Sequence, residues 1–103
     1  MIGEFEYLIL AASLRLADEA YGASIRREIE EATGAPCSIG ALYTTLDRLE
    51  TKGFIKTWMG EATSQRGGRA KRLVRLTPAG RNAASAFFHA VTRITGDIVW
   101  SSR

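Results

Sequence analysis

The side chains best suited to chemistry in this chain are cations and small polar groups in two neighbouring stretches. Residues 37–55 read CSIGALYTTLDRLETKGFI, and at helical spacing one face would carry Gly40, Ala41, Thr44, Asp47, Arg48 and Thr51. Residues 56–75 contain one acidic residue, Glu61, and six cations: Lys56, Arg66, Arg69, Lys71, Arg72 and Arg75. Small side chains allow a close approach to another surface, and clustered cations attract phosphates. The two stretches therefore predict an interface with a polyanion such as DNA.

Catalytic and metal-binding chemistry finds little support in the sequence. His89 is the single histidine, and no cysteine or carboxylate stands at metal-ligand spacing from it. Gly67-Gly68 lies between arginines rather than in a phosphate-binding loop after a strand. Cys37 is the single cysteine, so no intrachain disulfide can form, which fits a reducing cytosol. We expect no enzyme activity, no metal and no cofactor, and for Cys37 a packing role near a helix start.

The elements that must position these groups begin with a helix over 38–52. Four apolar residues recur at spacings of three and four on one stripe: Ile39, Leu42, Leu46 and Leu49. Ser38 precedes the stripe as a plausible N-cap, and Gly53 can end the helix with a positive φ. A preceding helix over about 21–33, with Ile25, Ile29 and Ala32 buried and its charged residues solvated, would complete a helix-turn-helix.

A β-hairpin is predicted next. Residues 55–59 and 71–76 are rich in β-branched and apolar side chains, as in strands, and residues 60–70 form the cationic tip between them. Trp58 would pack in the core or at the strand edge. Thr77 and Pro78 then start a last helix, as N-cap and first residue, that could continue to about Trp100.

Excess apolar surface on the first and last helices predicts self-association. The first helix, about 3–17, is apolar on two faces, and a domain this small can cover one of them. The last helix has few charges and a wide apolar surface. We expect a homodimer interface that contains Phe5, Leu8, Phe87, Phe88, Val91, Ile94 and Ile98. Trp100 packs across this dimer or lines a pocket for an aromatic effector.

Length and composition fit one small domain. The chain has 103 residues, 46% of them hydrophobic and 24% charged, with a net charge of +3. No apolar run approaches the roughly 18–20 residues needed to span a bilayer, and the N-terminus has glutamates instead of the basic segment of a secretory signal. We expect a cytoplasmic protein without a membrane partner.

Four sets of residues stand out along the chain: Tyr21-Gly22; Leu42-Tyr43 followed by Leu46, Leu49, Gly53 and Ile55; Gly68 to Arg72; and Leu76 to Gly80. Together they resemble the PadR family of bacterial transcriptional regulators, in the shorter type with one C-terminal helix. The resemblance implies a mainly α fold with a small β-hairpin wing: a winged helix-turn-helix domain over 1–77 and a C-terminal dimerisation helix over 78–103. It further implies a homodimer that represses transcription from a pseudo-palindromic operator and is released by a small hydrophobic or aromatic effector.

The DNA contacts can be divided by kind. Bases would be approached by the first half of the 38–52 helix, namely Ser38, Ile39, Gly40, Ala41 and Thr44, and Arg48 could reach a guanine or a phosphate. Asp47 would accept from a cytosine amino group or pair with Arg48. Tyr43 packs at the core edge, and the resemblance adds a phosphate contact. Phosphate or minor-groove contacts are assigned to Arg66, Arg69, Lys71 and Arg72. The alternative is a winged-helix module that binds an acidic protein partner.

Overall fold

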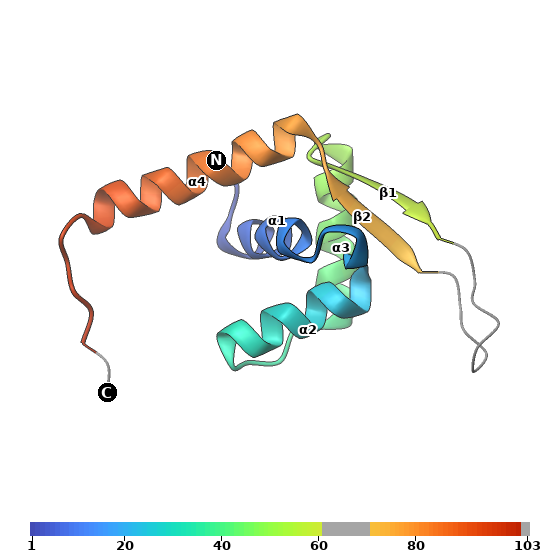
Figure 1. The fold of residues 1–103 in the computed structure, drawn as a ribbon, viewed down its shortest axis with the longest axis horizontal. Coiled ribbons are helices and arrows are strands. Elements are labelled where there is room, and N and C mark those ends of the chain that lie inside the picture. The colour runs from blue at the N-terminus through green and yellow to red at the C-terminus, as the bar shows by residue number, and fades with distance from the viewer. Residues whose placement is uncertain (61–70, 102–103) are drawn as a thin grey trace.

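The computed structural model describes residues 1–60 and 71–101, and its elements follow the order expected of a winged helix. Three helices come first, then two strands, then a long helix (Figure 1). Their bounds are α1 Glu4–Leu16, the 3-10 turn Ala17–Glu19, α2 Gly22–Thr33, α3 Ile39–Thr51, β1 Ile55–Met59, β2 Arg72–Leu76 and α4 Pro78–Thr95. Within the described residues the fold is therefore mainly helical with one antiparallel hairpin, as predicted.

The core lies where α1, α2 and α3 meet the base of the hairpin. Its largest fully buried side chains are Ile9, Leu10, Ile25, Leu42, Leu46, Leu49 and Ile55. Each contributes about 1.5–3 kcal/mol through removal of apolar surface from water. Because three of them come from α3, the core fixes which face of that helix points outward.

The hairpin is joined to the core by a third extended segment. Ile55 pairs with Leu76 at its base and Met59 with Arg72 at its far end. The backbone of Val74 donates to the carbonyl of Ala20, 3.0 Å away, and Tyr21 forms an isolated bridge with Leu73. The residues just before α2 are thus tied to β2, which sets the hairpin beside the helix-turn-helix.

Helix α4 leaves the core on the side opposite the hairpin (Figure 1). Thr77 caps it, since its hydroxyl accepts from the backbone N–H of Gly80 at 3.0 Å, and Pro78 is its first residue. The ring of Phe87 stacks on Tyr7 of α1, with centroids 5.1 Å apart. Beyond this contact the helix is largely exposed in the single chain, and Ile94 is 85% accessible.

The predicted extension of the last helix to Trp100 is wrong. Helix α4 ends at Thr95, and Gly96 follows with φ +53°. Glycine adopts this conformation without the steric cost that a Cβ would impose, so it favours termination here. Ile98 and Trp100 therefore lie in a non-helical tail rather than on the apolar stripe of α4.

Two residues of the predicted apolar stripes are exposed: Ala32, which was expected to be buried, and Ile39, which was also assigned to the DNA-contacting residues. Ala32 of α2 lies in the last turn and is exposed, in a hollow that it lines with Leu8 and Ala12 of α1. Ile39 is the first residue of α3 and is 54% exposed, whereas Leu42 is 1% exposed. Both lie in the terminal turns of their helices, where the helical period continues but the side chain is left exposed.

Candidate nucleic-acid interface

The outer face of α3 is polar, small and free of core contacts. Its N-terminal half exposes Ser38, Ile39, Gly40, Ala41 and Thr44, and Arg48 follows on the exposed side one turn later. The Ser38 hydroxyl accepts from the Ala41 backbone N–H at 3.2 Å, which confirms the predicted N-cap. This end of the helix can therefore approach another surface closely, with backbone and hydroxyl groups available for hydrogen bonds.

The turn between α2 and α3 is held by two charged side chains of α2. Arg26 donates from Nε to the carbonyl of Cys37 at 2.7 Å, and the Cys37 N–H donates to Glu30 Oε2 at 2.9 Å. Arg26 and Glu30 also pair with each other at 3.7 Å. These contacts fix the residue just before the N-cap of α3. The sequence interpretation placed both on a solvated face, although their i,i+4 spacing was a usable signal for a pair.

Cys37 is buried beside this turn, in agreement with the packing role predicted for it. Burial raises the pKa of the Cys37 thiol, and the neighbouring Glu30 carboxylate raises it further. The thiol is therefore kept protonated and poorly nucleophilic.

Tyr43 packs where α3 meets the start of α2. A Cβ at Gly22 would lie 2.7 Å from Cζ of the Tyr43 ring, closer than real contacts allow. Gly22 is thus the residue that lets the half-buried Tyr43 ring lie across the first turn of α2. The core-edge position predicted for Tyr43 agrees with this contact, and its phosphate contact stays a prediction.

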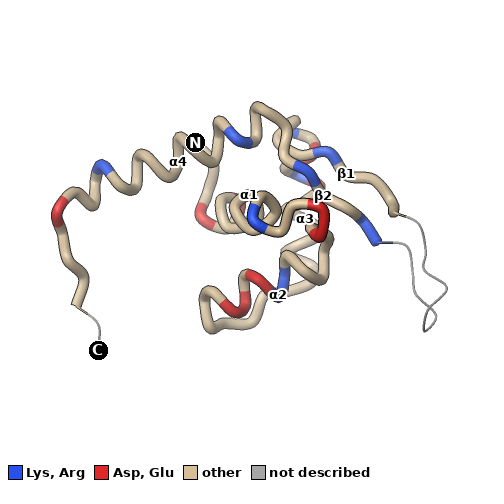
Figure 2. The backbone as a smooth tube through the Cα atoms, in the orientation of Figure 1, with Lys and Arg blue, Asp and Glu red and all other residues tan. Residues whose placement is uncertain are grey.

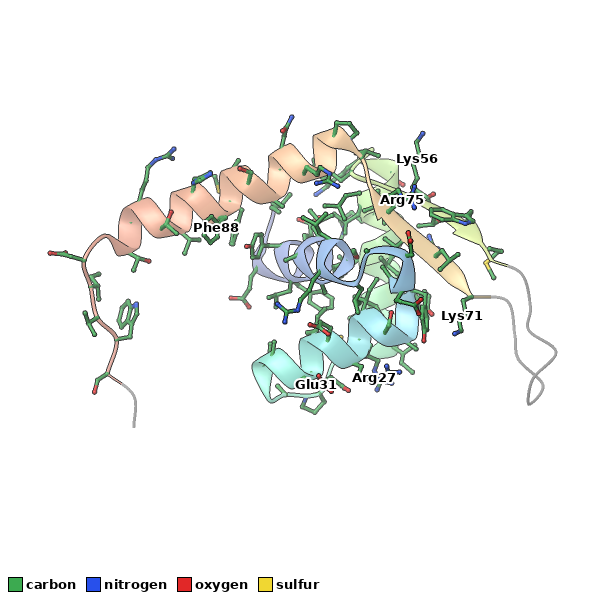
Figure 3. The ribbon with its side chains drawn as sticks, viewed as in Figure 1. Arg27, Glu31, Lys56, Lys71, Arg75 and Phe88 are labelled. Carbon is green, nitrogen blue, oxygen red and sulfur yellow. The ribbon has the colours of Figure 1, made fainter. Side chains whose placement is uncertain are left out.

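Cationic residues lie along both strands of the hairpin (Figure 2). Lys71 stands just before the first residue of β2, with its ammonium 4.3 Å from the centre of the Tyr21 ring (Figure 3). Lys56 is exposed on β1 and projects outward (Figure 3). Arg75 lies 5.6 Å from the ring centre of Trp58, which is at the surface of the hairpin, not in the core. Arg66 and Arg69, also predicted to contact DNA, lie outside the described residues.

Arg72 differs from the other hairpin cations because carboxylates of α3 already hold it. Its Nη2 lies 2.9 Å from Asp47 Oδ1 and 3.1 Å from Glu50 Oε1, and its side chain is 21% exposed. Asp47 was expected to pair with Arg48 or to meet a base; in the structure its partner is Arg72. The sequence could not reveal the Asp47–Arg72 pair, because the two residues lie far apart along the chain and only the folded structure brings β2 beside α3.

The surface assigned to dimerisation is partly packed and partly open. Phe5, Leu8 and Phe87 are half-buried within the chain, while Phe88, Val91, Ile94 and Ile98 are exposed. Phe88 points toward α1 from the exposed part of α4 (Figure 3) and helps line a hollow of about 360 Å³ with Tyr7, Leu10 and Leu14. Trp100 does not line this hollow and is 73% exposed in the tail.

Two further kinds of site, a membrane-spanning helix and a metal-binding cluster, are absent from the described residues. No helix there is long and apolar enough to cross a membrane. No three histidine, cysteine, aspartate or glutamate residues in residues 1–60 and 71–101 are grouped so that they could hold a metal ion.

Three helices with a helix-turn-helix, a hairpin and a polar outward face on α3 define a winged helix-turn-helix protein. Comparison with known proteins narrows this class. The Transcriptional regulator PadR-like family matches residues 10–86, and the chain belongs to this family. The family consists of transcriptional regulators, not enzymes, as the sequence predicted.

Individual relatives agree with this assignment. Transcriptional regulator Rv3488 of Mycobacterium tuberculosis is 34% identical over 84 residues, which cover 80% of this chain and 72% of the relative. The PadR-like transcription factor of Bacteroides fragilis has a similar structure, with a TM-score of 0.72 and 25% identity over 88% of this chain and 82% of that one. RosR of H. salinarum gives a TM-score of 0.67 and 27% identity over 95% of this chain and 81% of that one.

Proposed function

We propose that this PadR-family regulator binds DNA sequence-specifically as a homodimer and represses transcription from a pseudo-palindromic operator. The observation that carries the proposal is the outward N-terminal half of α3, where small and polar side chains stand beside a cationic hairpin. A helix of this kind fits the major groove, and its residues then meet the base edges.

Base reading is assigned to the exposed residues of the first turns of α3. Ser38, Gly40 and Ala41 allow close approach, and the Ile39 side chain offers an apolar surface to a thymine methyl group. Thr44 offers both a methyl and a hydroxyl group. Arg48 reaches a guanine or a phosphate from the next turn. Tyr43 places its hydroxyl near a phosphate while its ring packs inside.

Phosphate contacts are assigned to the hairpin. Lys71 is exposed and is the first residue that the structure describes after position 70. Arg66 and Arg69 belong to the same cationic stretch of the sequence. If each of these three cations neutralises one phosphate in each protomer, the dimer's slope of log K against log salt gains roughly −5 from the hairpin.

Dimerisation is assigned to residues 78–103 together with α1, and residues 1–77 form the DNA-binding part. The exposed apolar side chains of α4, including Phe88, Val91 and Ile94, support this division because a single chain leaves them in water. A small hydrophobic or aromatic effector near Trp100 would act through the same interface. Such a protein is expected in the cytoplasm, where its operator is.

Mobility shift with the DNA upstream of the protein's own gene tests the proposal, with a salt series and excess nonspecific competitor. A discrete complex that survives competition is expected, with a footprint whose half-sites lie about one helical turn, 10–10.5 bp, or a multiple of it apart. A complex that disappears with competitor would refute sequence-specific binding and favour the acidic protein partner.

Two kinds of variant separate base reading from phosphate binding. Thr44→Ala or Arg48→Ala should change the preference between operator sequences, and a uniform loss would show that the reading face is misplaced. Arg69→Ala combined with Lys71→Ala should weaken binding to all duplexes alike, and unchanged affinity at moderate salt would remove the hairpin from the interface.

A further inference from the structure

We propose that Arg72 is a positioning residue that locks the hairpin to the recognition helix α3, and that it does not contact DNA phosphate. The inference rests on the proposed function, because its value to the protein lies in how two DNA-contacting elements are held together. The carrying observation is the ion-pair cluster in which Arg72 of β2 meets Asp47 and Glu50 of α3.

The cluster joins α3 to both strands of the hairpin. Arg72 brings β2 to the helix through its two carboxylate contacts. Glu50 also binds β1: its carboxylate accepts from the Thr57 backbone N–H at 3.2 Å and from the Thr57 hydroxyl at 3.0 Å. One glutamate thus contacts β1 and β2 together, so the hairpin cannot rotate about its base without breaking several charge-assisted hydrogen bonds.

Charge and exposure argue against a phosphate role for Arg72. The Arg72 side chain is 21% exposed and its guanidinium is already shared by two carboxylates, so the cluster carries a formal charge of −1 from one cation and two anions. A DNA phosphate would have to approach this net negative group and displace a carboxylate. Lys71, the neighbouring residue, is exposed and lies against the Tyr21 ring, and among the described residues no carboxylate pairs with it, so it serves as the matched control.

The orientation of the hairpin relative to α3 matters for specificity more than for overall attraction. Phosphate contacts fix the register of a protein on the duplex, while the recognition helix reads the bases. If the two elements move independently, the hairpin cations still find phosphates on any sequence. The operator is then no longer favoured by contacting α3 and the hairpin at the same time, so the ratio of its affinity to that of other sequences falls.

The test compares Arg72→Ala, Lys71→Ala and the double variant Asp47→Ala/Glu50→Ala with the wild-type protein. Each is measured on an operator duplex and on a scrambled duplex over a salt series. Arg72→Ala should leave the salt slope unchanged and lower the operator-to-scrambled affinity ratio by about tenfold. Lys71→Ala should reduce the magnitude of the slope by about 1.8, for one contact in each protomer, and keep the ratio.

The double variant removes the acceptors and leaves Arg72 intact. If Arg72 acts through them, the ratio should fall as it does in Arg72→Ala. A ratio that holds or rises in this variant, with a steeper salt slope, would mean that the freed guanidinium binds phosphate, and would overturn the proposal. A slope change in Arg72→Ala equal to that of Lys71→Ala, with the ratio kept, would overturn it as well.

A measurement without DNA separates this inference from the proposed function. Backbone amide exchange of Thr57 should accelerate in Arg72→Ala, because Glu50 loses the cation that orients its carboxylate, and should be unchanged in Lys71→Ala. Unchanged Thr57 exchange in Arg72→Ala overturns the positioning role whatever the DNA result. If the wild-type protein does not prefer its operator, the proposed function is refuted. The Thr57 amide exchange then still tests whether Arg72 positions the hairpin, because that measurement needs no DNA.

Discussion

Replacement of Gly80 by alanine offers a sharp test of how α4 is attached to the core. Helix propensity alone predicts that this change stabilises the protein, by up to about 1 kcal/mol. The structure predicts the reverse. A Cβ at Gly80 would overlap the carbonyl oxygen of Phe54 and lie 2.9 Å from its carbonyl carbon. Both atoms belong to the backbone between α3 and β1, so no side chain can turn away to relieve the contact.

Relief by backbone movement is costly because the Phe54 carbonyl is itself held. It accepts from the Thr77 backbone N–H at 3.0 Å, and the Thr77 hydroxyl donates to the Gly53 carbonyl at 2.6 Å. Overpacking of a well-packed site costs about 1–3 kcal/mol, and a backbone clash belongs at the upper end. With a propensity gain of about 1 kcal/mol subtracted, we expect Gly80→Ala to destabilise the fold by about 2 kcal/mol.

Gly40→Ala is the matched control. Gly40 is also near the start of a helix, but the nearest atom to its added Cβ is Ser38 Oγ at 3.8 Å, which is ordinary contact. Thermal unfolding by circular dichroism at one protein concentration should show Tm lowered by about 8–16 °C for Gly80→Ala and raised by a few degrees for Gly40→Ala. An unchanged or raised Tm for Gly80→Ala would refute the close approach of α4 to Phe54.

Three further predictions concern single contacts. Lys52 donates to the Glu6 carboxylate at 2.8 Å and keeps the pKa of Glu6 below its ordinary value of 4.5. The stabilisation from the Lys52–Glu6 contact is present above pH 4.5 and is lost as pH falls through the lowered pKa of Glu6. Glu6→Gln should therefore flatten the acid side of a plot of Tm against pH. Parallel curves for the variant and the wild-type protein would contradict the ion pair. Thr77→Ala should cost about 1–2 kcal/mol in urea unfolding because α4 loses its cap, and an equal midpoint would show the cap to be idle. Cys37 should react with iodoacetamide at least about tenfold more slowly in the native protein than in urea; equal rates would mean that the thiol is not buried.

Local chemistry allowed most helix boundaries to be predicted from the sequence. Ser38 and Thr77 cap the helices that follow them, and Gly53 takes the positive φ expected after α3. These signals act within three or four residues, so no knowledge of the fold is needed to interpret them. The end of α4 was not predicted in this way, because the apolar period continues to Ile98 although the helix ends before Gly96.

Contacts between distant residues could not be predicted in the same way. The pairing of Arg72 with Asp47 depends on the hairpin folding back along α3. The requirement for glycine at positions 22 and 80 follows from approaches to Tyr43 and Phe54 that only the packed structure reveals. The sequence therefore predicted which helix face and which cationic stretch form the candidate site. It did not predict which of the charged side chains are held in ion pairs within the protein, as Arg72 is.

The contacts around α3 determine which of its surfaces can meet a duplex. Its inner face is buried, the turn before it is held by Arg26 and Glu30, and its C-cap residue Lys52 is paired with Glu6 of α1. Arg72 occupies the carboxylates on its hairpin side. What stays open is the N-terminal half with Arg48. Because the helix is already fixed in the free protein, the proposed complex would lose little conformational entropy when that face docks on DNA, and we expect the few side chains it exposes to contribute to discrimination between sequences.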